Sequence, residues 1–346
     1  MRPSIQTFFA LGRPGTPRWL VPAGHRLHGD PFLGWQPYRA TSRLAWAAMK
    51  SAVRCGAAPP MLPADSAYIE CIANLDWRSL GWYRPCDPEP LVYVGTPGNR
   101  RKVIVHLIDP NSHSCELIVK VPLTAAARPA IEHEAKTLLD LQNEGFEAAP
   151  RLVAFDRTAG VASQTIVRGS RAGLKLTREL ALLLQSLELR GGTISLREVA
   201  SALEKQTSRL ELSTADRALA ARALDEMNDT DDLPAVRVHG DFAPWNIKLP
   251  NGSAALVDWE DSWPRGLPLH DAYHFMHMTR CLFGKGPRPV SQELRFRYPF
   301  PLTNALRWKL ELAYLLQTLA CDMARPDQKY AAFALATLHK AIASRP

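Results

Sequence analysis

A short polar loop between two strand-like runs, in the second half of the chain, most constrains the fold. An apolar run leads into His-Gly-Asp at 239–241, and a turn at 250–252 returns the chain along a second run that ends at Asp258. Strands joined in this way lie side by side, so we expect Asp258 to emerge beside Asp241 and Asn246. The sequence therefore predicts two carboxylates and one amide at the ends of neighbouring strands.

These three residue types at this spacing indicate phosphoryl transfer. A carboxylate at the end of a strand can orient an attacking hydroxyl and accept its proton, which is the role that we expect of Asp241. Mg²⁺ prefers hard oxygen ligands and usually takes one or two from the protein, with water and substrate phosphates completing its shell. Asn246 and Asp258 with ATP would supply such a set. Their alternative is an ordinary role in turns or caps. We interpret His239 as a structural hydrogen-bonding residue, because the adjacent carboxylate already provides a base.

Around this loop the chain changes from strands to helices near residue 166. Strand-like runs are expected at 91–94, 102–108, 115–121, 151–155 and 162–167, with one helix from about 129 to 145. Leu-rich helical periodicity follows at 174–189, 195–210, 214–227, 303–323 and 327–342, and short β-like runs lie at 235–238 and 254–257. We therefore expect an α+β chain with an N-lobe at 89–165 and a helical C-lobe at 166–346. Residues 1–88, with one helix at 42–53, form an N-terminal extension of unknown role.

One basic residue stands alone inside an apolar strand. Lys120 lies in the run CELIVKV, where its charge is costly unless it is paired or bound to an anion. We therefore expect Lys120 to have a partner.

Together these motifs resemble the aminoglycoside phosphotransferase and choline kinase families, which share the protein-kinase-like fold; the match covers about residues 91–280. The resemblance implies a bilobal α+β fold with an antiparallel β N-lobe, a mainly helical C-lobe and ATP in the cleft. It also implies that Lys120 positions the nucleotide, braced by Glu134 or by its neighbour Glu132, although an ordinary ion pair is the alternative. Asp271 resembles the aspartate that supports the catalytic loop in these families.

The sequence departs from protein kinases at two places. The turn 95–102 lacks their multi-glycine phosphate loop, which leaves Gly98, with Gly95 and Asn99, as the nucleotide-binding candidates of this turn. After Asp258 come Trp259 and Glu260, which resembles choline and sugar kinases more than protein kinases.

Several other polar and aromatic residues surround the loop. We expect the hydroxyl acceptor near Glu260, Asp261 and the helices after residue 300. The indoles of three tryptophans have two interpretations, stacking on a sugar or organic cation and packing in the core; these are Trp245, Trp259 and Trp263. Three histidines share a predicted helix face without a matching carboxylate or cysteine, which disfavours a metal site; these are His270, His274 and His277. The acidic run 225–232 reads as a solvated helix end.

Composition excludes several other classes of protein. The 346 residues include 42 Lys and Arg against 34 Asp and Glu, a net charge of +8. This charge is spread evenly, with 18 basic and 14 acidic residues up to residue 165 and 24 and 20 after it, and no nucleic-acid-binding module is evident. We expect no nucleic-acid partner and no membrane span. Six scattered cysteines without zinc spacing fit a cytoplasmic protein.

Our prediction is an ATP- and Mg²⁺-dependent phosphotransferase that acts on a hydroxyl of a small molecule or sugar. Two alternatives stay open: a glycan or lipid-headgroup kinase, and a kinase-fold pseudoenzyme that binds nucleotide without turnover. A nucleic-acid binder is the weakest alternative. No pattern in the sequence specifies an oligomeric state.

Overall fold

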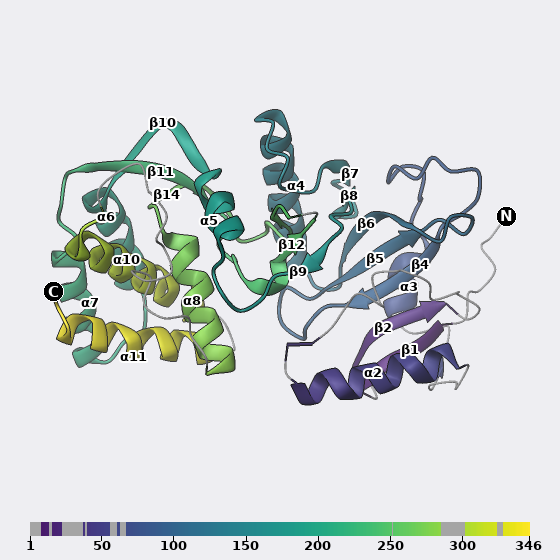
Figure 1. The fold of residues 1–346 in the computed structure, drawn as a ribbon, viewed down its shortest axis with the longest axis horizontal. Helices are drawn as coiled ribbons and strands as arrows, with labels where there is room; N and C mark the ends of the chain where they lie inside the picture. The colour runs from purple at the N-terminus through teal and green to yellow at the C-terminus, as the bar shows by residue number, and fades with distance from the viewer. Residues whose placement is uncertain are drawn as a thin grey trace. The chain divides into compact units, whose positions relative to one another are not determined.

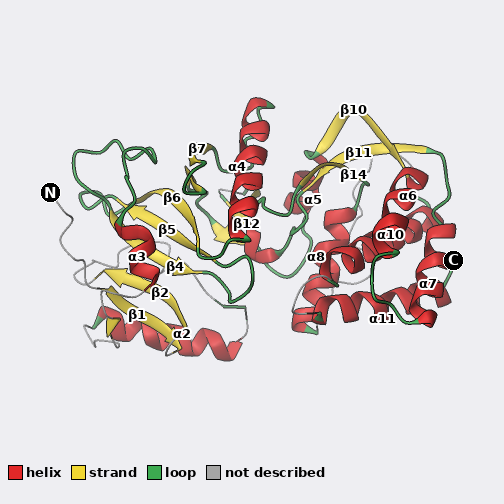
Figure 2. Cartoon of the chain, turned by 180° about the vertical axis from the view of Figure 1, so that it is seen from behind, coloured by secondary structure: helices red, strands yellow, loops and turns green. Residues whose placement is uncertain are grey.

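The computed structural model describes residues 8–13, 16–22, 37–38, 40–55, 61–62, 67–250, 252–284, 302–323 and 328–346. Asn251, in the predicted turn, and Asp327, at the start of the last predicted helix, lie outside these ranges. The chain divides into two compact units, residues 1–167 and 168–346. Strands dominate the first unit and helices the second (Figure 2). This mixed α+β content agrees with the predicted fold class.

The first unit is built on an eight-stranded sheet in the order β3-β1-β2-β4-β5-β6-β8-β7 (Figure 1). All of its neighbouring strands run antiparallel. The strands are β1 (Phe8–Arg13), β2 (Thr16–Pro22), β3 (Met61–Leu62), β4 (Glu89–Val94), β5 (Lys102–Ile108), β6 (Cys115–Pro122), β7 (Leu152–Asp156) and β8 (Val161–Thr165). The five runs predicted between 91 and 167 all form strands of this sheet.

Part of the predicted N-terminal extension belongs to the same sheet. Strand β2 pairs with β4 through Trp19↔Tyr93 and Leu20↔Val92, and helix α2 (Ala40–Arg54) includes the helix predicted at 42–53. Both faces of the sheet are covered, because Trp46 of α2 packs on one face while Ile72 of helix α3 (Ala67–Ala73) packs on the other. Such strands show no clear alternation of apolar and polar residues, so sequence periodicity did not reveal β1 and β2.

Successive side chains of β6 point alternately to the two faces of the sheet. Val119 and Val121 are buried in the apolar cluster on the α3 side. Lys120 lies between them in sequence and therefore points to the opposite face, where helix α4 (Ala127–Asn143) packs on β6, β7 and β8. The predicted helix over 129–145 is α4.

The second unit combines helices with two three-stranded sheets, in the orders β10-β11-β14 and β13-β12-β9. The strands are β9 (Ser170–Arg171), β10 (Glu188–Ser195), β11 (Asp232–Val238), β12 (Ile247–Leu249), β13 (Ala255–Leu256) and β14 (Trp263–Gly266). The helices are α5 (Arg178–Gln185), α6 (Leu196–Thr207), α7 (Thr214–Asp225), the 3₁₀ turn η1 (Pro244–Asn246), α8 (His270–Phe283), α10 (Asn304–Asp322) and α11 (Lys329–Ala343). Helix α10 packs against α6, α7, α8 and α11.

One predicted helix is too long. The Leu-rich pattern at 174–189 predicts a single helix, but α5 ends at Gln185 and β10 begins at Glu188 to pair with β11. Gly191, with φ at +70°, follows in the strand, where a helix would not continue. In the described ranges no helix is both long enough and apolar enough to cross a membrane.

Candidate active site

In the first unit the isolated lysine of β6 has a buried partner. The Nζ atom of Lys120 donates to both carboxylate oxygens of Glu134 on α4, at 2.7 and 2.6 Å. Only 4% and 2% of the two side chains are exposed. Glu132, the other residue considered for this role, is exposed on the same helix. The geometry therefore pairs Lys120 with Glu134.

Gly98 lies in the exposed turn between β4 and β5, with open space around its Cα. The ends of this turn are held by main-chain hydrogen bonds, from the Gly95 N–H to the Lys102 carbonyl at 2.9 Å and from the Leu123 N–H to the Arg101 carbonyl at 2.9 Å. The turn thus leaves the backbone of Gly98 exposed to solvent.

In the second unit Asp271 supports the turn that carries Asp241. Its carboxylate accepts the backbone N–H groups of His239 at 2.7 Å and Gly240 at 3.0 Å, immediately after β11. Gly240 has φ at +81°, and a Cβ atom there would lie 2.0 Å from the Asp261 carbonyl oxygen, so only glycine fits. Burial raises the pKa of Asp271, and His239 with the two N–H donors only partly offsets this. Asp271 therefore holds the main chain of the turn immediately before Asp241.

His239 is fully buried, and both of its ring nitrogens are used. Its Nε2 lies 3.1 Å from the Val257 carbonyl oxygen, which can only accept, and its Nδ1 accepts the Asp241 N–H at 3.3 Å. The ring also meets Trp259 edge-on, with centroids 4.6 Å apart. Trp259 is itself fully buried and donates to the Leu256 carbonyl, so it belongs to the core. Through these contacts His239 links the end of β11 to the residue that follows β13.

Asn246 lies in η1 and contacts Asp241 twice. Its Nδ2 donates to the Asp241 backbone carbonyl at 3.0 Å and to the Asp241 Oδ2 at 2.8 Å. Because both of these partners are acceptors, the amide orientation is settled, and Oδ1 of Asn246 is the atom that can bind a cation.

Asp258 follows β13, which pairs with β12 through Ile247↔Leu256. The Val257 N–H donates to the Asn246 carbonyl at 2.9 Å, which carries the pairing to the residue before Asp258. Asp258 has φ at +69°, a left-handed conformation that is unusual for a side chain other than glycine and that recurs at functional sites. Its negative charge acts on Asp241. The strand pairing thus brings Asp241, Asn246 and Asp258 together as predicted.

The electrostatic environment keeps Asp241 ionised. Burial raises the pKa of its carboxyl, and the charge of Asp258 adds to this. A hydrogen bond from His274, with the electrostatic effects of His274 and His239, outweighs both and places the pKa of Asp241 below its ordinary value. A carboxylate in this state can accept a proton from a substrate.

Sequence reasoning did not assign His274 to this site. The predicted helix face is real, since α8 carries His270, His274 and His277, but their partners differ. His274 Nε2 lies 3.1 Å from Asp241 Oδ1, and His277 Nε2 lies 2.8 Å from Glu311 Oε1. Within the described ranges no group of three or more His, Cys, Asp or Glu side chains is arranged to hold a metal ion.

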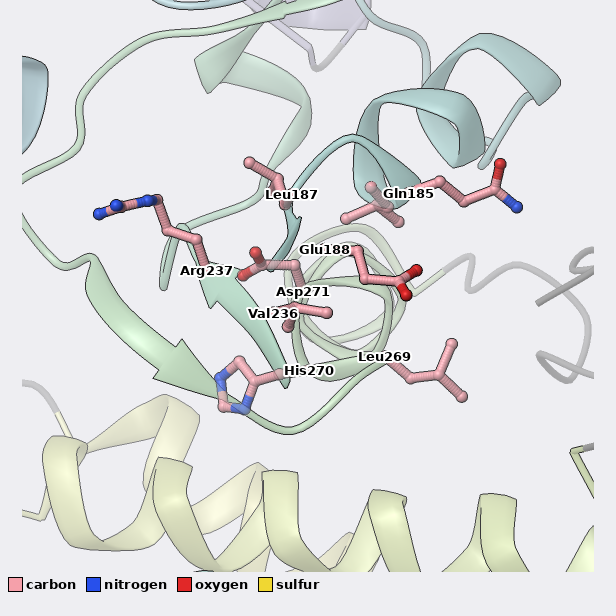
Figure 3. A pocket seen from close by; sticks show the side chains of 9 residues that line it. Gln185, Leu187, Glu188, Val236, Arg237, Leu269, His270 and Asp271 are labelled. Atoms are coloured by element: carbon pink, nitrogen blue, oxygen red, sulfur yellow. The ribbon is translucent and has the colours of Figure 1, made fainter. Parts of the chain in front are cut away.

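A small cavity lies behind the supporting aspartate, where α5, β10, β11 and the start of α8 meet (Figure 3). Its volume is about 20 Å³, and its polar lining includes Glu188, Arg237, His270 and Asp271. A cavity of this size holds about one water molecule, so it is too small for an acceptor.

Comparison with models of known protein families assigns the chain to a family. The model of the phosphotransferase enzyme family matches residues 99–292, more than half of the sequence. The chain belongs to this family. The match includes Lys120, Glu134, the His-Gly-Asp loop and Asp271. The predicted family resemblance and the prediction of a phosphotransferase enzyme are thereby confirmed. No match was found among curated proteins.

Solved structures show the fold of the enzyme. The GDP and kanamycin complex of APH(2")-IIia is 15% identical, with a TM-score of 0.54, and the match covers 81% of this chain and 99% of that one. A ternary complex of a thermostable mutant of aminoglycoside phosphotransferase APH(4)-Ia with ADP and hygromycin B is 15% identical, with a TM-score of 0.51, and the match covers 73% of this chain and 93% of that one. Choline kinase LicA from Streptococcus pneumoniae is 17% identical, with a TM-score of 0.48 and coverage of 72% and 92%, and adds nothing to this assignment. The predicted protein-kinase-like fold is confirmed.

Proposed function

We propose that this enzyme moves the γ-phosphate of ATP to a hydroxyl group of a small molecule or sugar. The observation that carries the proposal is the ionised carboxylate of Asp241, held by Asn246 beside a second carboxylate, Asp258. The solved neighbours crystallised with ADP and with GDP support a nucleotide as donor, and their complexes with hygromycin B and kanamycin support a hydroxyl-bearing acceptor.

Asp241 acts as the base in this proposal. It accepts the proton as the acceptor oxygen forms its bond to the γ-phosphorus, while the bond from that phosphorus to the bridging oxygen breaks and ADP leaves. Its side chain is 29% exposed, which leaves room for a hydroxyl to approach. Most of the rate enhancement comes from holding the acceptor hydroxyl and the γ-phosphate in line, because the protein itself forms no covalent bond to the substrates.

Mg²⁺ fits the donors of the second unit. Asn246 has its amide nitrogen committed to Asp241, which leaves a carbonyl oxygen for the ion. The charge of Asp258 opposes ionisation of Asp241, although the pKa of Asp241 stays below its ordinary value, and a divalent cation would relieve this repulsion. Asn246 and Asp258 would therefore hold Mg²⁺, which neutralises charge on the nucleotide phosphates when bound.

The remaining predicted residues receive supporting roles. We assign Lys120, oriented by Glu134, to the nucleotide phosphates, and the open turn around Gly98 to a weaker contact with them. His239 and Asp271 hold the catalytic turn. We place the acceptor near Glu260 and Asp261, because the Asp261 backbone packs directly on Gly240.

The test is ATP consumption by the purified enzyme with Mg²⁺ across a panel of aminoglycosides, amino alcohols, sugars, glycans and lipid headgroups. We expect turnover with one acceptor class, and a loss of at least a hundredfold in kcat for Asp241→Asn. Equal turnover by the variant would refute the assignment of the base. ATP binding by both proteins without turnover would instead support the pseudoenzyme alternative, and turnover only with glycans or lipid headgroups would redefine the acceptor.

A further inference from the structure

The catalytic carboxylate is held at both of its oxygens by side chains from different elements. Asn246 donates to Oδ2 at 2.8 Å, and His274 Nε2 lies 3.1 Å from Oδ1. Asp241 follows β11 in sequence, whereas His274 lies on α8, one turn after the supporting Asp271. The same helix therefore contacts both the backbone and the side chain of the catalytic loop.

The proton between His274 and Asp241 belongs to the histidine. An ionised carboxylate has no proton to donate, so Nε2 carries the hydrogen and donates it to Oδ1. With its proton on Nε2, a neutral imidazole has Nδ1 as an acceptor, and Nδ1 of His274 lies 3.5 Å from the hydroxyl of Tyr314 on α10. The Tyr314 hydroxyl is in turn hydrogen-bonded to the hydroxyl of Tyr330 on α11. A chain of hydrogen-bonding groups thus leads from α11 through α10 to the carboxylate.

Packing fixes the position of the imidazole. His274 is 8% exposed and Tyr314 is 1% exposed. Both tyrosine rings meet the imidazole edge-on, with centroids 6.1 Å away for Tyr314 and 6.0 Å away for Tyr330. A ring enclosed in this way cannot turn aside without displacing its neighbours. Its hydrogen bond to Asp241 is therefore held ready before substrate binds.

The other two histidines of α8 do not share this arrangement. His277 pairs with Glu311 of α10, and His270 packs edge-on against Trp263 and Tyr314. Burial, with a smaller contribution from His274, lowers the pKa of His270 to about 3, so it is neutral. Within the described part of the chain, His274 is the histidine of this face that bonds to Asp241.

We propose that His274 is a positioning residue for phosphoryl transfer: it fixes the rotation of the Asp241 carboxylate, and the hydroxyls of Tyr314 and Tyr330 hold its tautomer. The proposal rests on the proposed function. A carboxylate bonded at one oxygen only can rotate, so fewer of the bound acceptor hydroxyls meet it in line. The step affected is the chemical one, and nucleotide binding is not involved.

The first test is kinetic. His274→Phe keeps the ring volume and removes the donor, and we expect kcat to fall about ten- to a hundredfold while KM for ATP stays within about twofold. His274→Gln keeps a donor on a flexible chain and should recover part of the loss. Tyr314→Phe and Tyr330→Phe each remove one hydroxyl and should lower kcat by about two- to tenfold. Arg280→Gln, which alters an exposed residue of the same helix, is the control and should leave kcat unchanged.

Thermal unfolding of each variant separates misfolding from lost positioning. A His274→Phe enzyme that unfolds at the wild-type temperature with unchanged kcat would overturn the proposal. So would equal losses of kcat in His274→Phe and Arg280→Gln, because a general effect on helix α8 would then explain both.

The second test does not depend on turnover. Nitrogen NMR of ¹⁵N-histidine-labelled protein reports which ring nitrogen of His274 carries the proton. We expect a protonated Nε2 in the wild type, and a changed signal for His274 but not for His277 in Asp241→Asn. A neutral ring protonated at Nδ1 would overturn the proposal. If no acceptor is phosphorylated but the NMR result is as expected, the proposed function fails while the contact between His274 and Asp241 stands.

Discussion

The buried pair of Lys120 and Glu134 gives the sharpest test of the first unit. Glu134→Gln leaves the ammonium group of Lys120 in a site where only 4% of its side chain is exposed. Breaking a buried ion pair by removing one partner costs about 3–5 kcal/mol, because an uncompensated charge stays in a poorly solvated place. The gain that the pair contributes relative to apolar residues is much smaller, since both charges were desolvated to form it.

The double variant Lys120→Met with Glu134→Leu separates structure from function. It removes both charges and keeps similar volume, so we expect it to recover most of the stability that Glu134→Gln loses. If Lys120 positions the nucleotide, the double variant should still bind ATP about ten- to a hundredfold more weakly, since a hydrogen bond from a charged group contributes about 1.5–3 kcal/mol.

The assay must report on the first unit by itself, because a chain of two compact units need not unfold in one step. Amide hydrogen exchange in peptides from β6 and α4 measures its local stability in each variant. ATP affinity is measured by titration calorimetry. A loss below about 1 kcal/mol in Glu134→Gln would refute the burial argument. A stable double variant with wild-type ATP affinity and turnover would show that the pair is an ordinary ion pair.

Three further predictions concern the second unit. Asp271→Ala leaves two backbone N–H groups without their acceptor, so we expect a loss of about 2–5 kcal/mol in local stability, measured by hydrogen exchange in peptides from β11 and α8, with a lower kcat; the loss should be smaller in Asp271→Asn, which keeps one acceptor. Gly240→Ala should lose more stability than the control Gly145→Ala; both have positive φ, which costs about 1–2 kcal/mol, but only Gly240 also meets a carbonyl oxygen, at 2.0 Å. His270 has its pKa lowered to about 3, so below pH 6.5 the unfolded chain takes up a proton that the folded enzyme does not. Folding stability should then fall by up to about 1.4 kcal/mol per pH unit as pH drops from 6.5 toward 3, and the slope should be smaller than this limit because the His270 side chain is partly exposed. His270→Asn should flatten the slope, and equal slopes in the wild type and the variant would contradict a lowered pKa for His270.

The sequence by itself determined the local part of the candidate site. Asp241, Asn246 and Asp258 lie on two short strands joined by one turn, so their spacing along the chain nearly specifies their proximity in space. The position of Lys120 in an apolar strand likewise predicted a partner for its charge, because burying an unpaired charge is costly.

Tertiary structure alone decided the contacts between distant segments. Both Glu132 and Glu134 lie on α4, and only packing against β6 buries one of them beside Lys120. Strand β2 pairs with β4, which lies about 70 residues further along the chain, and β1 pairs with β2 and β3; neither β1 nor β2 carries a periodic signal of its own. His274 reaches Asp241 across 33 residues because α8 packs against the catalytic loop. A sequence pattern records neighbours along the chain, whereas burial and hydrogen bonding depend on which faces meet after folding, and that is settled only by the packing of the whole unit.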